Sequence, residues 1–389
     1  MKSGTRLAAA DGMRAMSVLI IALYHFWQQS WLELSVTVGG RRFTLLPMMR
    51  VGYLFVDVLL LLSAFLLYLP YASARFSQKQ PPTLKQFYQK RALRILPGYL
   101  LGILLPLFVL AIPAHKYSGV MDLLSDLVPY LTFTQTFFPK VYQASRLNSV
   151  LWTVGIEVQA YLIFPLAAKA FDKKPGSTYL VMVLMGLLYR YGIWRILPDL
   201  TLWVNQLPSF VDVYANGMLA AWLYVRWRER PPTTWERVVC TLGSCAAMFG
   251  IWRLVCVQSG MSWEMKGLHE GQALLRFPLT ALAAAWLLLT ERSFKGFKLV
   301  FGNVVTRWVA GVSYAFYIWH QLLAVKLRMD WRFPPYLAAE NPQFAGERPW
   351  QWLYMITCFV VGLLAAAVVT YGWERPITRL LTRRNENVR

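Results

Sequence analysis

The stretch of sequence that decides the fold is residues 51–71, which read VGYLFVDVLLLLSAFLLYLPY and contain one charged side chain, Asp57. An α-helix rises about 1.5 Å per residue, so about 20 mainly apolar residues cross the hydrocarbon core of a bilayer. This stretch therefore predicts a membrane-spanning helix. The whole chain of 389 residues has the same character, with 57% hydrophobic and 15% charged residues, whereas a soluble domain carries about 25% charged residues. This composition excludes a soluble globule and a disordered chain.

Ten runs of this kind are long enough to cross a bilayer. They are residues 13–33, 51–71, 95–113, 150–171, 178–197, 209–227, 238–257, 272–290, 307–327 and 351–373. Since no repeat or break in composition separates them, we expect one all-α polytopic membrane domain over residues 1–389. Its ten helices are predicted to form a single bundle around a central polar cavity. About 16 residues follow the last run, so we expect no appended soluble domain.

The basic residues predict the orientation of the chain. The net charge is +21, from 40 Lys and Arg against 19 Asp and Glu. With the N-terminus inside the cell, the inner segments hold 23 basic residues and the outer loops hold 10. Because cytoplasmic loops of membrane proteins are enriched in Lys and Arg, we expect both termini inside, in a multi-pass protein of the plasma (inner) membrane. Basic residues placed between apolar spans also argue against a nucleic-acid partner.

One inner loop, residues 72–94, is unusually basic. It reads ASARFSQKQPPTLKQFYQKRALR, with six basic residues and no acidic one. Pro81 and Pro82 interrupt the chain there, and a short basic helix is predicted to follow. Two roles are open for this loop. It binds lipid headgroups, or it binds a polyanionic ligand, because Arg matches the geometry of phosphate.

Ionisable side chains inside a bilayer are costly, which makes them candidates for function. The predicted spans contain His25, Asp57, Glu157, Asp212 and His320. Counting residues from the end of each span places all of these side chains, except that of Asp212, at one level in the outer half of the membrane. This common level predicts a shared polar cavity. Taken singly, Glu157 and His320 serve a structural hydrogen bond as readily as a chemical step.

His25 has a second relation, to Arg14 in the same predicted helix. Eleven residues are about three helical turns, so the two side chains share a face about 16–17 Å apart. Asp11, three residues before Arg14, is placed to orient it. A long anionic ligand with a reactive far end suits this spacing, and acyl-coenzyme A has that shape.

Several segments resemble the integral-membrane acyltransferase 3 family. Residues 11–15 (DGMRA) and His25 resemble its first helix, in which an Arg is followed after ten residues by a His. Residues 56–67 (VDVLLLLSAFLL) resemble its second helix, with Ala64 where the family usually has Gly. Residues 90–94 (KRALR) resemble its Arg-Arg-x-x-Arg motif, with Lys in the first position.

The later segments agree in order and spacing. Residues 151–165 (LWTVGIEVQAYLIFP) resemble the fourth helix of the family, which carries a Glu, here Glu157. Residues 311–321 (GVSYAFYIWHQ) and 371–381 (YGWERPITRLL) resemble its last two spans. The resemblance covers the chain from residue 11 to about residue 381.

The resemblance implies an acyltransferase. Members move an acyl group, often acetyl, from cytoplasmic acyl-coenzyme A to a hydroxyl of an extracytoplasmic glycan or glycolipid. It implies that His25 is the catalytic centre, either as general base or as acyl carrier. Asp57 or Glu157 then holds the imidazole, and His320 belongs to the same catalytic layer.

The resemblance also assigns the donor side of the site. Arg14, Lys90, Arg91 and Arg94 are expected to hold the phosphates of acyl-coenzyme A, acetyl-coenzyme A above all, with Asp11 beside Arg14. No metal is expected, because the four cysteines lie in apolar stretches without metal-ligand spacing. The alternative is a transporter or exporter with a polar pathway at the midplane, which predicts related halves and broken helices that the sequence does not show.

Overall fold

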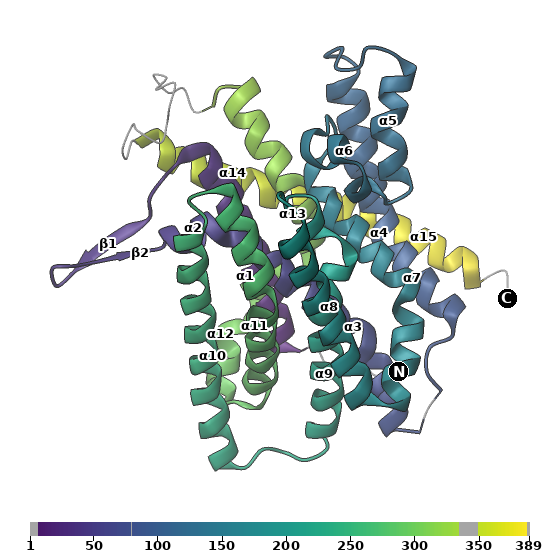
Figure 1. Cartoon of the computed structure of the whole chain (residues 1–389), viewed down its shortest axis with the longest axis vertical. Helices are drawn as coiled ribbons and strands as arrows, with labels where there is room; N and C mark the ends of the chain where they lie inside the picture. The colour runs from purple at the N-terminus through teal and green to yellow at the C-terminus, as the bar shows by residue number, and fades with distance from the viewer. Residues whose placement is uncertain (1–6, 79, 334–348, 387–389) are drawn as a thin grey trace. The chain divides into compact units, whose positions relative to one another are not determined.

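The structure is a computed structural model that describes residues 7–78, 80–333 and 349–386 (Figure 1). The chain divides into two compact units. Unit 1 comprises residues 1–24, 34–82 and 163–311, and unit 2 comprises residues 25–33, 83–162 and 312–389. Three helices have residues in both units. They are α1 (Ala8–Ser30), α7 (Trp152–Lys173) and α13 (Val304–Val325).

Unit 1 is built mainly from long apolar helices. They are α3 (Phe55–Phe76), α8 (Pro175–Ile196), α9 (Val211–Trp227), α10 (Thr234–Met261) and α11 (Met265–Arg292). The shorter elements are α2 (Leu46–Val51), α12 (Lys295–Phe301), and the 3₁₀ turns η1 (Gly52–Leu54), η5 (Trp203–Asn205) and η6 (Leu207–Phe210). Helix α3 packs along α9, and α10 packs along α11 (Figure 1).

The contact between α3 and α9 depends on small residues. A Cβ placed on Gly217 of α9 would lie 2.7 Å from the Cβ of Ala64 and 2.9 Å from the backbone nitrogen of Phe65. These separations are too short for non-bonded atoms. Helices in membranes approach closely where small residues line their interface. Ala64 therefore faces a glycine that makes room for it.

Unit 2 contains α4 (Leu84–Pro106), α5 (Val120–Leu131), α6 (Pro139–Ala144), α14 (Pro349–Val369) and α15 (Arg375–Glu386). Its 3₁₀ turns are η3 (Gln135–Phe137) and η4 (Ser149–Leu151). Its π-helical turns are η2 (Leu107–Ala111), η7 (Lys326–Asp330) and η9 (Thr370–Glu374), the last of which joins α14 to α15.

The short basic helix predicted after Pro81 and Pro82 is not a separate element. The basic residues form the first turns of α4, which continues into the apolar run. Thr83 and Gln86 form a capping box, in which each side chain accepts a hydrogen bond from the other's backbone N–H. This cap satisfies backbone donors that a helix start leaves unpaired, so the helix begins at Leu84, about ten residues before the predicted span.

Other segments of unit 2 compensate for a proline inside α4. Pro97 has no N–H, so the carbonyl of Leu93 loses its normal helical partner. The hydroxyl of Thr378 in α15 donates to that carbonyl at 3.1 Å. The indole of Trp373 donates to the carbonyl of Pro97 at 2.8 Å, and Tyr314 donates to the carbonyl of Ile95 at 2.9 Å. Helix α4 is thereby bonded to η9, α13 and α15.

An antiparallel hairpin lies in the first loop that is predicted to be outer, and the hairpin was not predicted from the sequence. It consists of β1 (Ser35–Val38) and β2 (Arg41–Thr44), with Val38 opposite Arg41 (Figure 1). Both turn residues have positive φ, +57° at Gly39 and +75° at Gly40. Paired glycines of this kind favour a two-residue hairpin turn. Outside this hairpin, the regular secondary structure of the described residues is helical, which confirms the all-α membrane class.

Seven helical segments of the described residues are long and apolar enough to cross a membrane. The other three predicted spans correspond to α1, α9 and α13. Helix α9 has only 17 residues, and α1 and α13 carry more polar side chains, His25 and His320 among them. Two of these three less apolar helices, α1 and α13, are therefore the ones that carry the candidate histidines.

Contacts within unit 1 agree with the predicted alternation of loops. Two predicted inner segments meet where Arg228 donates to the hydroxyl of Ser73. Two predicted outer loops meet where Arg50 donates to the carbonyl of Ser262, at 3.3 Å.

Candidate active site

The imidazoles of His25 and His320 lie together in unit 2. Their ring centroids are 5.2 Å apart and their planes are tilted by 48°. His25 lies near the end of α1 and His320 near the end of α13. The ring of Phe26 contacts that of His320, with centroids 6.2 Å apart. The structure thus brings together two of the four predicted catalytic residues as a pair.

Gln28 orients the imidazole of His25. Its Oε1 lies 3.0 Å from Nδ1 of His25. An amide oxygen only accepts hydrogen bonds, so this contact places the proton on Nδ1 and makes Nε2 the basic nitrogen. A carboxylate was expected in this role, and Gln28 was not predicted from the sequence. The signal was its spacing, because residues i and i+3 of a helix are neighbours.

The second imidazole is held by backbone. Nδ1 of His320 lies 2.7 Å from the carbonyl oxygen of Tyr317 and 3.1 Å from that of Phe316. Carbonyl oxygens only accept, so Nδ1 carries the proton here as well. The opposite nitrogen, Nε2, is buried and has no hydrogen-bond partner among the described residues. A buried polar atom without a partner is uncommon and needs an explanation.

The predicted donor-binding residues of α4 differ in exposure. Lys90 and Arg94 are exposed, and Arg91 is half-buried. The guanidinium of Arg91 lies 5.9 Å from the ring of Phe87 and 6.0 Å from that of Tyr161. Its Nε is buried and has no hydrogen-bond partner among the described residues. Arg91 therefore presents a partly buried cation beside two aromatic rings.

Glu157 connects the arginines to the histidine pair within unit 2. Its carboxylate accepts a hydrogen bond from the hydroxyl of Tyr161, one turn along α7. It also interacts electrostatically with Arg91 and with Tyr317. The ring of Tyr317 lies 5.7 Å from that of His320. Unit 2 therefore gathers both histidines, Glu157 and the basic residues of α4.

Asp57 lies in unit 1 and has its own partner there. Its Oδ2 accepts a hydrogen bond from Nε of Arg276 at 3.0 Å, and both side chains are fully buried. A second buried ion pair lies nearby, with 2.6 Å between Nη2 of Arg190 and Oδ2 of Asp212. Arg190 donates to the carbonyl of Ser209, and Arg276 donates to the hydroxyl of the same residue. Charges buried in this way are paired because isolated ones are very costly. That Asp57 holds the imidazole of His25 stays a prediction.

Asp11 and Arg14 also lie in unit 1, on the first turns of α1, where both are half-buried. Asp11 interacts electrostatically with Glu291. The donor-binding roles predicted for Asp11 and Arg14 stay predictions. Among the residues that the structure describes, no group of three or more His, Cys, Asp or Glu side chains is arranged to hold a metal ion.

Residues 7–372 match the family model described as an acyltransferase domain, Acyl_transf_3. The chain belongs to the acyltransferase 3 family. This assignment confirms the resemblance inferred from the motifs. No solved structure matches the chain.

Three named proteins are similar to this chain. Acyltransferase MdmB of Streptomyces mycarofaciens is 28% identical over 44% of this chain and 41% of its own length. Peptidoglycan O-acetyltransferase OatA of Listeria monocytogenes is 20% identical over 80% of this chain and 48% of its own length. A putative O-acetyltransferase of Staphylococcus aureus is 22% identical over 80% of this chain and 49% of its own length. The chain thus spans about half the length of these relatives or less.

Proposed function

We propose that the protein transfers an acyl group, acetyl in the first instance, from acyl-coenzyme A to a hydroxyl of an extracytoplasmic glycan or glycolipid. The observation that carries the proposal is the histidine pair, in which Gln28 fixes the tautomer of His25. The relatives named as O-acetyltransferases support acetyl as the group. The relative named for peptidoglycan supports a glycan acceptor.

In the first form of the mechanism, His25 is a general base. Its Nε2 takes the proton of the acceptor hydroxyl while the hydroxyl oxygen attacks the thioester carbonyl carbon. The C–S bond then breaks, and the imidazolium returns the proton to the leaving thiolate. Imidazole suits both steps because its ordinary pKa lies near neutrality. Oε1 of Gln28 stabilises the N–H of the imidazolium.

In the second form, His25 carries the acyl group. Nε2 attacks the thioester carbonyl, the C–S bond breaks, and the thiolate leaves. The acceptor hydroxyl then attacks the acyl-imidazole, the C–N bond breaks to restore the imidazole, and the proton of the hydroxyl passes finally to the thiolate. His320 has a use in this form, because the lone pair on its Nε2 accepts the proton that the acceptor hydroxyl loses. Its separation from His25, 5.2 Å between ring centroids, leaves both rings within reach of one acceptor. Both forms require the same arrangement of residues.

The donor is proposed to bind through its phosphates to the basic side chains Arg91, Arg94, Lys90 and Arg14, with Asp11 orienting Arg14. Glu157 fits a positioning role, because it interacts with Arg91 and with Tyr317, whose carbonyl holds His320. Asp57 is proposed as the alternative carboxylate that holds the imidazole of His25, and within unit 1 it is the partner of Arg276.

The test is acyl transfer from radiolabelled acetyl-coenzyme A by the purified full chain in nanodiscs, with a glycan fraction of the source cells as acceptor. His25→Ala should abolish transfer and leave unfolding temperature near that of the wild type. The matched control is His115→Asn, because His115 is an exposed histidine of unit 2 with φ +48°, which Asn tolerates. Full transfer by His25→Ala, or equal loss in His115→Asn, would reject the assignment.

A further inference from the structure

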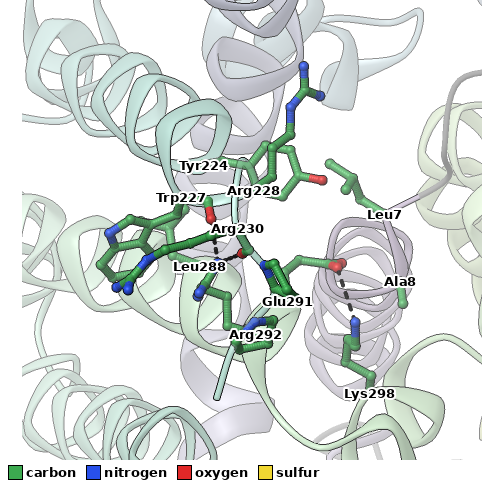
Figure 2. A pocket seen from close by; sticks show the side chains of 12 residues that line it. Leu7, Ala8, Tyr224, Trp227, Arg228, Arg230, Leu288, Glu291, Arg292 and Lys298 are labelled. Atoms are coloured by element: carbon green, nitrogen blue, oxygen red, sulfur yellow. Dashed lines mark hydrogen bonds and ion pairs between the residues drawn. The ribbon is translucent and has the colours of Figure 1, made fainter. Parts of the chain in front are cut away.

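A basic cavity of about 340 Å³ lies in unit 1, and none of the roles above uses it. Figure 2 shows the side chains that line it, which come from the start of α1, from the end of α9 and the residues after it, from the end of α11, and from α12. Its basic members are Arg228, Arg230, Arg292 and Lys298, and its one acidic member is Glu291.

Two of these cations serve the fold. Arg292 is buried and donates to the backbone carbonyls of Trp227 and Arg230, so it ties α11 to the segment after α9. Arg230 forms an ion pair with Glu236, with 2.8 Å between Nη2 and Oε1. These contacts fix the shape of the cavity and neutralise part of its charge.

The remaining cations are available to a ligand. Arg228 donates to the hydroxyl of Ser73 at 3.3 Å, and no acidic residue in the described part of the chain forms an ion pair with it. Lys298 lies 3.9 Å from Glu291, a long ion pair. Glu291 also accepts a hydrogen bond from the backbone N–H of Ala9 at 2.7 Å. Four cations thus share two carboxylates, those of Glu291 and Glu236, and positive charge is left over.

The start of α1 adds to this field. Leu7 and Ala8 line the cavity, and Ala8 is the first residue of the helix. The N-terminus of a helix carries partial positive charge and backbone N–H groups that bind anions. Trp227 and Tyr224 supply flat aromatic surface beside the cations (Figure 2). The combination of Arg, Lys, a helix start and aromatic rings is suited to phosphate attached to an organic group.

We propose that this cavity is a binding site for a phosphate monoester, with Arg228 and Lys298 as its principal ligands. The segments that line it all belong to the predicted inner side, so the phosphate is presented from the cytoplasm. The ligand chemistry has two sources. One is a dissolved nucleotide that carries a phosphate monoester, and the other is the headgroup of an anionic lipid, such as phosphatidic acid.

The experiment measures binding of two named probes to the purified full chain in phosphate-free buffer. Adenosine 3′,5′-bisphosphate is titrated calorimetrically against protein in an uncharged detergent. Phosphatidic acid is supplied in phosphatidylcholine nanodiscs, and its retention is read by native mass spectrometry. The variants are Arg228→Gln and Lys298→Gln. The matched control is Arg226→Gln, because Arg226 is an exposed arginine of α9 that does not line the cavity.

We expect at least one probe to bind, with affinity about tenfold weaker in each of the two variants, because each loses a charged hydrogen bond to phosphate. Arg226→Gln should bind within about twofold of the wild type. If the affinity for adenosine 3′,5′-bisphosphate falls in Arg228→Gln, the ligand is a dissolved nucleotide. If only the retention of phosphatidic acid falls in that variant, the ligand is a lipid. Binding of neither probe, or equal binding by all three variants, overturns the proposal.

The unfolding temperature of each variant shows whether the fold is intact, and Arg228→Lys should recover part of the affinity because it restores the charge. The proposal is independent of the chemistry at His25. His25→Ala should bind the phosphate probe as the wild type does, whatever happens to acyl transfer.

Discussion

Replacing Asp57 by Asn tests whether this carboxylate stabilises the fold or acts in the reaction. The substitution keeps the size of the side chain and removes its charge. Arg276 is then left fully buried without its acidic partner, although it still donates to the carbonyl of Val204 at 2.7 Å and to the hydroxyl of Ser209. The neighbouring pair of Arg190 and Asp212 shares Ser209 and is expected to be disturbed as well.

The size of the effect follows from the burial of both partners. Removing one member of a buried ion pair typically costs about 3–5 kcal/mol, because the other charge is left uncompensated. Because Arg276 keeps its other hydrogen bonds, we expect Asp57→Asn to lower the free energy of unfolding by about 3 kcal/mol. A loss of that size lowers the ratio of folded to unfolded protein by about two orders of magnitude.

The assay is unfolding of the purified chain in mild detergent, by heat and by titration with a denaturing detergent, beside acyl transfer at a temperature where each variant is folded. Glu264→Gln is the control, because Glu264 is an exposed acid of unit 1. Asp57→Leu combined with Arg276→Met should recover part of the stability, since buried pairs are often replaceable by apolar residues. An Asp57→Asn protein that is as stable as the wild type and inactive would refute the structural role and favour a catalytic one.

The remaining predictions concern other parts of the molecule. Gln28→Leu should lower kcat for acyl transfer about tenfold with little change in KM, because Nδ1 of His25 loses the acceptor that selects its tautomer; a change confined to KM would contradict this. Gly217→Ala should destabilise unit 1 by about 1–3 kcal/mol, measured by thermal unfolding, whereas Gly176→Ala should have little effect because a Cβ there meets nothing within 4 Å. The Arg146 guanidinium and the Ser118 backbone N–H hold the pKa of the Asp122 carboxyl below its usual range. The ion pair between Arg146 and Asp122 therefore stabilises the folded state at neutral pH. This stabilisation is lost as the pH falls through the lowered pKa of Asp122. The protection of backbone amides around residues 118–146, relative to their intrinsic exchange rate at each pH, should fall below about pH 4 in the wild type and should already be low at pH 7 in Asp122→Asn. Protection that does not change with pH would contradict this prediction.

The sequence predicted the features of the fold that depend on neighbouring residues. Each of the ten expected spans has a helix at its position, because hydropathy over about 20 residues is a local property. The start of α4 was misplaced because a capped helix tolerates basic residues in its first turns. The hairpin was missed although Gly39 and Gly40 signalled a turn, since its strands are only four residues each.

The site was predicted less completely, for a physical reason. The family motifs identified His25, Glu157 and His320, which the structure gathers in one unit. The partner of Asp57 is 219 residues away in the chain, and no spacing rule relates such distant positions. No pattern in the sequence singled out Arg276 as the partner of Asp57. The structure shows that this charge is the reason Asp57 can be buried.

The bond between Thr378 and the carbonyl of Leu93 has a consequence for the end of the chain. Residues after the last apolar span look like a dispensable basic tail. The hydroxyl of Thr378, however, donates the hydrogen bond that Pro97 cannot donate because it has no N–H. A chain cut after Glu374 would expose an unpaired carbonyl on the helix that carries Arg91 and Arg94. The C-terminal segment thus stabilises the turn of α4 that contains Pro97. An epitope tag fused directly to a shortened end would disturb the helix that carries Arg91 and Arg94 without contacting either residue.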